Sequence, residues 1–132
     1  MSWINLREEP VIYINENPYV LRSIRDQFDN LHYPGITNTR VLEMSNRLKN
    51  DVIREAKYYH NKLLVYQEES THSLTSSWED THVGSIQTLN DVFDMIHNDG
   101  YRVRYFSIPI STFDLPSPSV CFYSFPPSWF IK

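Results

Sequence analysis

Close to the start of the sequence, residues 3–14 form an opening stretch that reads Trp3-Ile4-Asn5-Leu6-Arg7-Glu8-Glu9-Pro10-Val11-Ile12-Tyr13-Ile14. Two runs rich in β-branched and aromatic residues flank a charged segment, a pattern typical of two short strands joined by a loop. We therefore predict strands over residues 2–6 and 11–14. Turn-forming residues at 15–18 then predict that residues 11–21 fold as a β-hairpin.

Residues 39–59 have apolar side chains at three- and four-residue steps, which predicts an amphipathic helix; they are Val41, Met44, Leu48, Val52, Ala56 and Tyr59. Either Asn38 or Thr39 is suited to cap this helix. The apolar run within residues 62–67 predicts a buried strand. The polar, Ser/Thr-rich residues 68–80 that follow predict an exposed loop.

Thr88 and Asp91 have the spacing of a capping box, and they begin a short apolar stripe that ends before Gly100. This pattern predicts a second helix, and residues 101–108 after it predict a strand. Because strands alternate with helices along the chain, the order favours an α/β fold around a largely parallel sheet.

The composition is that of one ordinary globular domain, with 132 residues, of which 41% are hydrophobic and 21% charged. No apolar run approaches the length of a membrane span, and the N-terminus lacks the basic and apolar regions of a secretory signal. We therefore expect a cytoplasmic protein without a membrane span. The net charge of -4 disfavours nucleic-acid partners, and the five histidines lack metal-site spacing, so no metal or other cofactor is expected.

The composition changes near the C-terminus. Five of the eight prolines and four of the seven phenylalanines lie in residues 109–132. Proline restricts the backbone and removes a hydrogen-bond donor, which disfavours both helix and central strand. We therefore predict a domain over residues 1–116, followed by a divergent Pro- and aromatic-rich tail over residues 117–132.

The opening stretch, together with Pro18-Tyr19-Val20-Leu21-Arg22, closely resembles the start of a repeat in the paladin and phytase-like cysteine phosphatases, the inositol hexakisphosphate phosphatase-like family. Further segments resemble the same family in the same order: Tyr33-Pro34-Gly35-Ile36, residues 47–56, Ser85-Ile86-Gln87-Thr88 and Asp99-Gly100-Tyr101-Arg102-Val103. The resemblance covers residues 2–116 and corresponds to the N-terminal part of one repeat only.

This resemblance implies a fold like that of the dual-specificity and phytase-type cysteine phosphatases. Their substrates are phosphate esters, including inositol phosphates. In that chemistry a thiolate attacks phosphorus and forms a cysteinyl-phosphate, while an arginine and backbone amides of a C-x5-R loop hold the phosphate oxygens. An aspartic acid protonates the leaving group.

The C-x5-R loop is missing from this sequence. Its single cysteine, Cys121, is followed six residues later by Pro127, and no arginine follows Arg104. Because nothing nearby would lower its pKa, we expect Cys121 to be an inert thiol and not a nucleophile. We therefore expect an incomplete phosphatase-like fold, in which the phosphate-loop strand and the helices after it are missing.

The general acid is also displaced relative to the family pattern. In many relatives an aspartate directly follows a Pro-Ile-Thr motif, whereas here Pro109-Ile110-Ser111 is followed by Thr112. The nearest candidate is Asp114, two residues later. An offset of this size moves a carboxylate by several ångströms, away from hydrogen-bond reach of a leaving oxygen.

Arg7 is the remaining candidate for phosphate binding. In the phytase-like relatives the arginine of the corresponding stretch lies at the substrate pocket, and a guanidinium suits phosphate through its paired donors. Alternatively, Arg7 pairs with Glu8, Glu9 or a helix carboxylate and anchors its own loop. Because the C-x5-R loop is missing, we expect any phosphorylated ligand to bind at low affinity under either interpretation.

The leading functional prediction is a truncated, paladin-like, protein-tyrosine-phosphatase-like protein without catalytic activity of its own. One alternative is a noncatalytic binding or adaptor module, and another is the partial product of a gene whose full protein is a phosphatase. Loss of the phosphate-loop strand would expose apolar surface on the remaining sheet. We therefore expect a protein partner, or the aromatic tail, to cover that surface.

Overall fold

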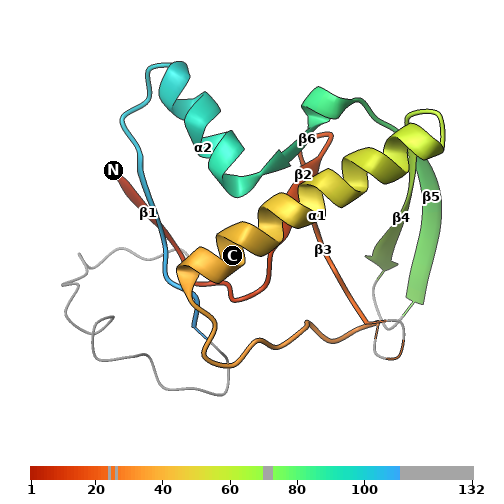
Figure 1. Cartoon of the computed structure of the whole chain (residues 1–132), viewed down its shortest axis with the longest axis horizontal. Helices are drawn as coiled ribbons and strands as arrows, with labels where there is room; N and C mark the ends of the chain where they lie inside the picture. Colours follow the sequence, from red (N-terminus) through yellow and green to blue (C-terminus); the bar gives the residue numbers. More distant parts are fainter. Residues whose placement is uncertain (24, 26, 70–72, 111–132) are drawn as a thin grey trace.

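A computed structural model describes residues 1–23, 25, 27–69 and 73–110 of the chain. The described residues form a mixed α/β arrangement with small sheets and two α-helices (Figure 1). The predicted domain boundary at residue 116 and the tail over residues 117–132 lie outside the described residues. So do two of the predicted site residues, Asp114 and Cys121.

The two ends of the described chain meet in one small sheet. Strand β1 (Ser2–Asn5) pairs with β7 (Arg104–Ser107) in parallel, in a register that places Ile4 opposite Phe106. Figure 1 shows this pair at one end of the molecule. Both strands were predicted from the sequence, although β7 is shorter than the predicted residues 101–108.

The predicted hairpin is confirmed and forms the centre of the molecule. Strand β2 (Val11–Ile14) pairs antiparallel with β3 (Asn17–Val20) and, on its other side, with β6 (Ile86–Thr88). Asn15 and Glu16 form the turn with φ angles of 49° and 68°. Positive φ at both central residues suits the right-handed twist of a tight hairpin. The sequence reading missed β6 because three residues are too few to show a period.

The exposed loop that was predicted over residues 68–80 is wrong, because most of these residues belong to a second hairpin. Strand β4 (Lys62–Glu69) is longer than predicted and pairs over its full length with β5 (Ser73–Asp80). Leu63 and Val65 are buried, whereas most side chains of β5 are exposed. The polar composition of β5 therefore reflects a strand that faces solvent, because the backbone ladder does not depend on apolar side chains.

The sheet is not largely parallel, as the alternation of elements had suggested. Among the described strands, only β1 and β7 pair in parallel; the pairs formed by β2, β3 and β6, and by β4 and β5, are antiparallel. For β2–β3 and β4–β5 the physical reason is a short connection between consecutive strands, which forms a hairpin and needs no long crossover.

Helix α1 (Asn38–Tyr58) crosses the molecule from the β1–β7 sheet to the β4–β5 hairpin (Figure 1). Its predicted extent is right to within one residue, but the cap is wrong. Thr37, not Asn38 or Thr39, is the N-cap, and its side chain accepts a hydrogen bond from the Arg40 N–H. Of the predicted apolar stripe, Val41 and Ala56 are buried, and Leu48 and Val52 pack against the core. Tyr59 at its end is 43% exposed and contacts Trp78 of β5 instead.

The core lies between α1 and the strands β2, β4 and β6. It consists of a cluster of buried side chains, namely Ile12, Ile14, Ala56, Leu63, Val65 and Ile86. Ile86 is the most enclosed, with 1% of its surface exposed. Burial of such side chains contributes about 1.5–3 kcal/mol each, so this cluster fixes α1 on the central sheet.

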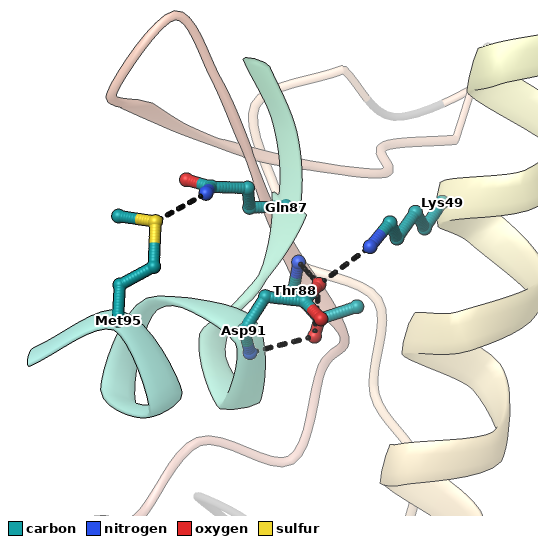
Figure 2. A network of polar contacts seen from close by, with 5 residues as sticks. All are labelled: Lys49, Gln87, Thr88, Asp91 and Met95. Atoms are coloured by element: carbon teal, nitrogen blue, oxygen red, sulfur yellow. Dashed lines mark hydrogen bonds and ion pairs between the residues drawn. The ribbon is translucent and has the colours of Figure 1, made fainter. Parts of the chain in front are cut away.

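Helix α2 (Leu89–Asn98) begins at the predicted capping box. Thr88 Oγ1 accepts a hydrogen bond from the Asp91 N–H, and Asp91 Oδ2 accepts one from the Thr88 N–H at 2.6 Å. Lys49 of α1 donates to the same carboxylate at 2.8 Å (Figure 2). The start of α2 is therefore tied to α1 as well as to β6.

The same network sets the protonation of Asp91. Burial would raise the pKa of its carboxyl group, but hydrogen bonds from Lys49 and Thr88 outweigh burial and hold the pKa below its ordinary value of 3.8. Figure 2 also shows Gln87 donating to the Met95 sulfur, a second link between β6 and α2.

Among the described residues, no helix is long and apolar enough to cross a membrane.

We predict that Thr88→Ala lowers the free energy of unfolding by about 1 kcal/mol, because the cap of α2 is lost. Urea denaturation followed by circular dichroism measures the change. Thr75→Ala on the exposed β5 strand is the control, and an equal loss in the two variants would contradict the capping role.

We also predict that Asp91 makes stability depend on acid. A carboxylate whose folded-state pKa is depressed stabilises the protein above its unfolded pKa, and this contribution is lost as the pH falls through the folded-state value. Asp91→Asn should therefore lose less stability between pH 6 and about pH 3 than the unsubstituted chain. Asp51→Asn, on the exposed face of α1, serves as the control; identical acid profiles for the Asp91 variant and the unsubstituted chain would refute the assignment.

Candidate functional site

The carboxyl ends of β1 and β7 lie at one edge of their sheet. The loops that leave this edge stay paired, because the Ile108 N–H donates to the Asn5 carbonyl at 2.8 Å and the Ile110 N–H donates to the Leu6 carbonyl at 3.0 Å. In open α/β structures, ligands bind outside the carboxyl ends of parallel strands. This edge is therefore where the fold favours a site.

Arg7 lies at this edge, directly after β1. Its side chain is 53% exposed, and one guanidinium nitrogen lies 3.7 Å from a carboxylate oxygen of the buried Glu9. A guanidinium carries five N–H donors, so the contact with Glu9 leaves others directed to solvent. The structure thus shows the ion pair that would anchor the loop, and it also leaves the guanidinium open to an anion.

Asn5 fixes the backbone that carries Arg7, a role that the sequence reading missed. Its side-chain oxygen accepts a hydrogen bond from the Arg7 N–H at 3.2 Å, and its amide donates to the Tyr105 hydroxyl at 3.3 Å. The first of these contacts links a side chain to the backbone two residues later, which is the pattern of an Asx turn. The Asn-x-Arg spacing was the available signal.

Two buried carboxylates accompany Arg7. Glu8 is 4% exposed; its Oε1 lies 3.3 Å from Nδ1 of His32, and its Oε2 has no hydrogen-bond partner within the described part of the chain. Glu9 supports Arg7, as described above. Both negative charges lower the attraction of this edge for an anion, so a phosphate held by Arg7 alone would be held weakly.

A small cavity lies behind the edge, between the β1–β7 sheet and the first turns of the two helices. Its lining includes Asn5, Glu9, Ser45, Tyr105 and Ser107. Its volume of about 20 Å³ is far below the several hundred Å³ of a typical ligand pocket. A phosphate ester would therefore have to bind outside the cavity, at the exposed guanidinium.

The structure thus brings one predicted site residue, Arg7, to the edge where a ligand is expected, whereas Asp114 and Cys121 fall outside the described residues. Within the described part of the chain, no group of three or more His, Cys, Asp or Glu side chains is arranged to hold a metal ion.

Residues 4–121 match the family model of the protein-tyrosine-phosphatase-like phytases. The description of this family names inositol hexakisphosphate. The chain belongs to this family. The match covers most of the 132 residues and confirms the resemblance that the opening stretch carries. No curated protein and no solved structure matches the chain.

Membership of the phytase-like family makes this a phosphatase-like domain. The mixed α/β arrangement, with small sheets and two helices, is compatible with such a domain.

We predict that Ser107→Ala raises the free energy of unfolding by up to about 1 kcal/mol. The Ser107 hydroxyl is buried and has no hydrogen-bond partner among the described residues, so its removal relieves a desolvated polar group. Thermal unfolding measures the effect, with Ser45→Ala as the comparison. Ser45 Oγ donates to the Val41 carbonyl at 2.9 Å, so its loss should destabilise; a loss of stability for Ser107→Ala would refute the prediction.

Proposed function

We propose that this chain is a paladin-like, cytoplasmic phosphatase-like domain that binds phosphate esters weakly and does not hydrolyse them by itself. The proposal is supported by the position of Arg7 together with the lack of a C-x5-R segment in the sequence. An exposed arginine stands at the carboxyl ends of the parallel strands, in a sequence whose 132 residues contain no C-x5-R segment. The first supports binding, and the second argues against catalysis.

The chemistry of the family explains why catalysis is not expected. Hydrolysis through a cysteinyl-phosphate requires a thiolate aligned with phosphorus and several donors that converge on the three equatorial oxygens. Cys121 has Pro127 in place of the required arginine, and no glycine lies near it in the sequence. The sequence of 132 residues therefore contains no C-x5-R segment that could form the phosphate loop.

The expected affinity follows from the number of contacts. A hydrogen bond to a charged group contributes roughly 1.5–3 kcal/mol, whereas a dissociation constant of 1 mM already requires about 4 kcal/mol. Arg7 also shares its charge with Glu9. We therefore expect binding in the millimolar range or weaker for inorganic phosphate, and tighter binding only for a ligand that offers several phosphates.

A noncatalytic adaptor is the second candidate function. Trp3 is 56% exposed and Phe106 is 41% exposed, although both belong to a sheet that pairs in parallel. Exposed apolar side chains on such a sheet favour an interaction partner. The third reading, a partial product of a gene whose full protein is a phosphatase, is tested by translating the adjoining coding sequence and searching it for a C-x5-R segment.

We predict no turnover of p-nitrophenyl phosphate or inositol hexakisphosphate by the purified 132-residue chain. Phosphate release is measured against a blank, and Cys121→Ser is assayed in parallel. Hydrolysis by the unsubstituted chain that disappears in Cys121→Ser would overturn the noncatalytic assignment.

For binding, we predict that Arg7→Ala weakens the interaction with inositol hexakisphosphate at least threefold, whereas Glu9→Gln strengthens it by freeing the guanidinium. Amide chemical shifts recorded during a titration give both constants. The matched control is Arg54→Ala, which removes the same charge from an exposed ion pair with Asp51 on α1. Equal weakening by the two arginine variants would show nonspecific charge attraction and would remove Arg7 from the site.

A further inference from the structure

One edge of strand β4 is unpaired within the described part of the chain. The Thr81 N–H donates to the Asn61 carbonyl at 2.8 Å, which makes the odd-numbered residues of β4 the ones that bond to β5. The backbone groups of Leu64, Tyr66 and Glu68 therefore point to the other edge, where no described strand pairs. Figure 1 shows the β4–β5 hairpin at the end of the molecule opposite to the β1–β7 sheet.

This edge lacks the features that usually protect an exposed strand. Its centre, residues 63–66, is an uninterrupted apolar run without proline or charge, the pattern of a strand that is covered on both faces. Leu63 and Val65 are buried in the core. Leu64 is nevertheless 39% exposed and Tyr66 is 58% exposed. An edge of this kind is a template for pairing with another chain.

We propose that a second copy of this chain pairs with the free edge, β4 against β4, antiparallel about a two-fold axis at Val65. In this register Leu64 of one copy lies opposite Tyr66 of the other. Lys62 lies opposite Glu68 in the same way. Because the interface is isologous, each of these contacts occurs at both ends of the pairing. The two hairpins would then form one continuous sheet.

Hydrogen bonding and side-chain chemistry both select this register. Even-numbered residues face one another, so the outward N–H and C=O groups of Leu64 and Tyr66 exchange hydrogen bonds. A slip of one residue would oppose them to groups already bonded to β5. A slip of two residues would place Lys62 opposite Tyr66, or Leu64 opposite Glu68. The proposed register brings apolar side chains together and opposite charges together, and such cross-strand pairs stabilise an antiparallel ladder.

The charged side chains and the space that this pairing needs are accessible. Lys62 is 52% exposed and Glu68 is 47% exposed. Their partners within the chain, Asp80 and Arg22, each lie at 3.5 Å, and ion pairs at such exposure contribute little. Beside the edge lies a surface groove of about 900 Å³ that is lined by residues of β3 and β4. An incoming strand therefore finds open space along this edge.

The proposal is independent of phosphate binding. Arg7 lies directly after β1, at the other end of the molecule (Figure 1). The phosphate titration and the association of two copies can therefore succeed or fail separately. Because one pair of strands is small compared with the interface of a permanent dimer, association should depend on protein concentration.

Sedimentation equilibrium of the 132-residue chain, from micromolar to millimolar concentration, tests the dimer. We expect reversible association, which Lys62→Glu and Glu68→Lys each weaken about tenfold, because both symmetric ion pairs become repulsive. The chain with both substitutions should recover the original association to within about threefold. Within one chain the double exchange opposes like charges to Asp80 and to Arg22, so the recovery can arise only between copies.

A pair of proline variants tests which edge of the hairpin is used. Tyr66→Pro removes an N–H that points away from β5, so the hairpin keeps its own ladder while the dimer should be lost. Ser76→Pro is the matched control, because Ser76 lies opposite Tyr66 in the register and its N–H points to the outer edge of β5. This variant should still form the dimer, and circular dichroism verifies that both variants fold.

Amide hydrogen exchange separates a second copy from other occupants of the edge. We expect the Leu64 and Tyr66 amides to become protected as the protein concentration rises. Protection that is equal at every concentration would mean that the chain covers this edge itself, and the proposal would be wrong.

Three sedimentation results would also overturn the proposal. The unsubstituted chain remains a monomer up to millimolar concentration, or the double charge exchange fails to recover what the single exchanges lose. In the third case Ser76→Pro abolishes the dimer and Tyr66→Pro does not, which would assign the interface to β5.

Discussion

The parallel pairing of β1 with β7 is the contact on which the candidate site depends. It joins residues that are about one hundred positions apart, and closing a flexible loop of that length costs roughly 4 kcal/mol. The hydrogen bonds of a ladder with only four residue pairs offset little of this entropic penalty. The sheet therefore relies on the aromatic contacts of Phe93 with Trp3 and Tyr105, and hence on the position of α2.

The position of α2 depends in turn on the capping box at its N-terminus, formed by Thr88 and Asp91. Thr88 ends β6 and caps α2, while Asp91 receives both the Thr88 N–H and the Lys49 ammonium. One carboxylate thus connects the central sheet, α1 and α2. The core around Ile86 holds β6 under α1, so a chain of contacts runs from the best-packed part of the molecule to the edge that carries Arg7. The site is placed from the core outward.

The sequence predicted those parts of the fold whose signals are local. The period of α1, the capping box of α2 and the hairpin of β2 and β3 each follow from residues within a few positions of one another. It did not predict β5, because side chains such as Ser76 and Ser77 face solvent and carry no apolar alternation. The direction of strand pairing was also wrong, since pairing depends on contacts between distant segments. At the candidate site, Arg7 was proposed from the resemblance of its neighbours to the family, and Glu9 was one of three kinds of partner suggested for it. Geometry was needed to single out Glu9 and to show the hydrogen bond of Asn5 with the Arg7 N–H.

The distribution of charge at the edge limits how strongly it can attract an anion. Phosphoryl transfer requires backbone amides and a guanidinium that converge on the phosphate oxygens in the transition state. The described edge offers one arginine, and that arginine is already paired with a buried carboxylate. Glu8 and Glu9 lie deeper than Arg7, so they hold the loop in place at the expense of anion affinity. The contacts that stabilise this edge are therefore the same ones that lower its attraction for an anion.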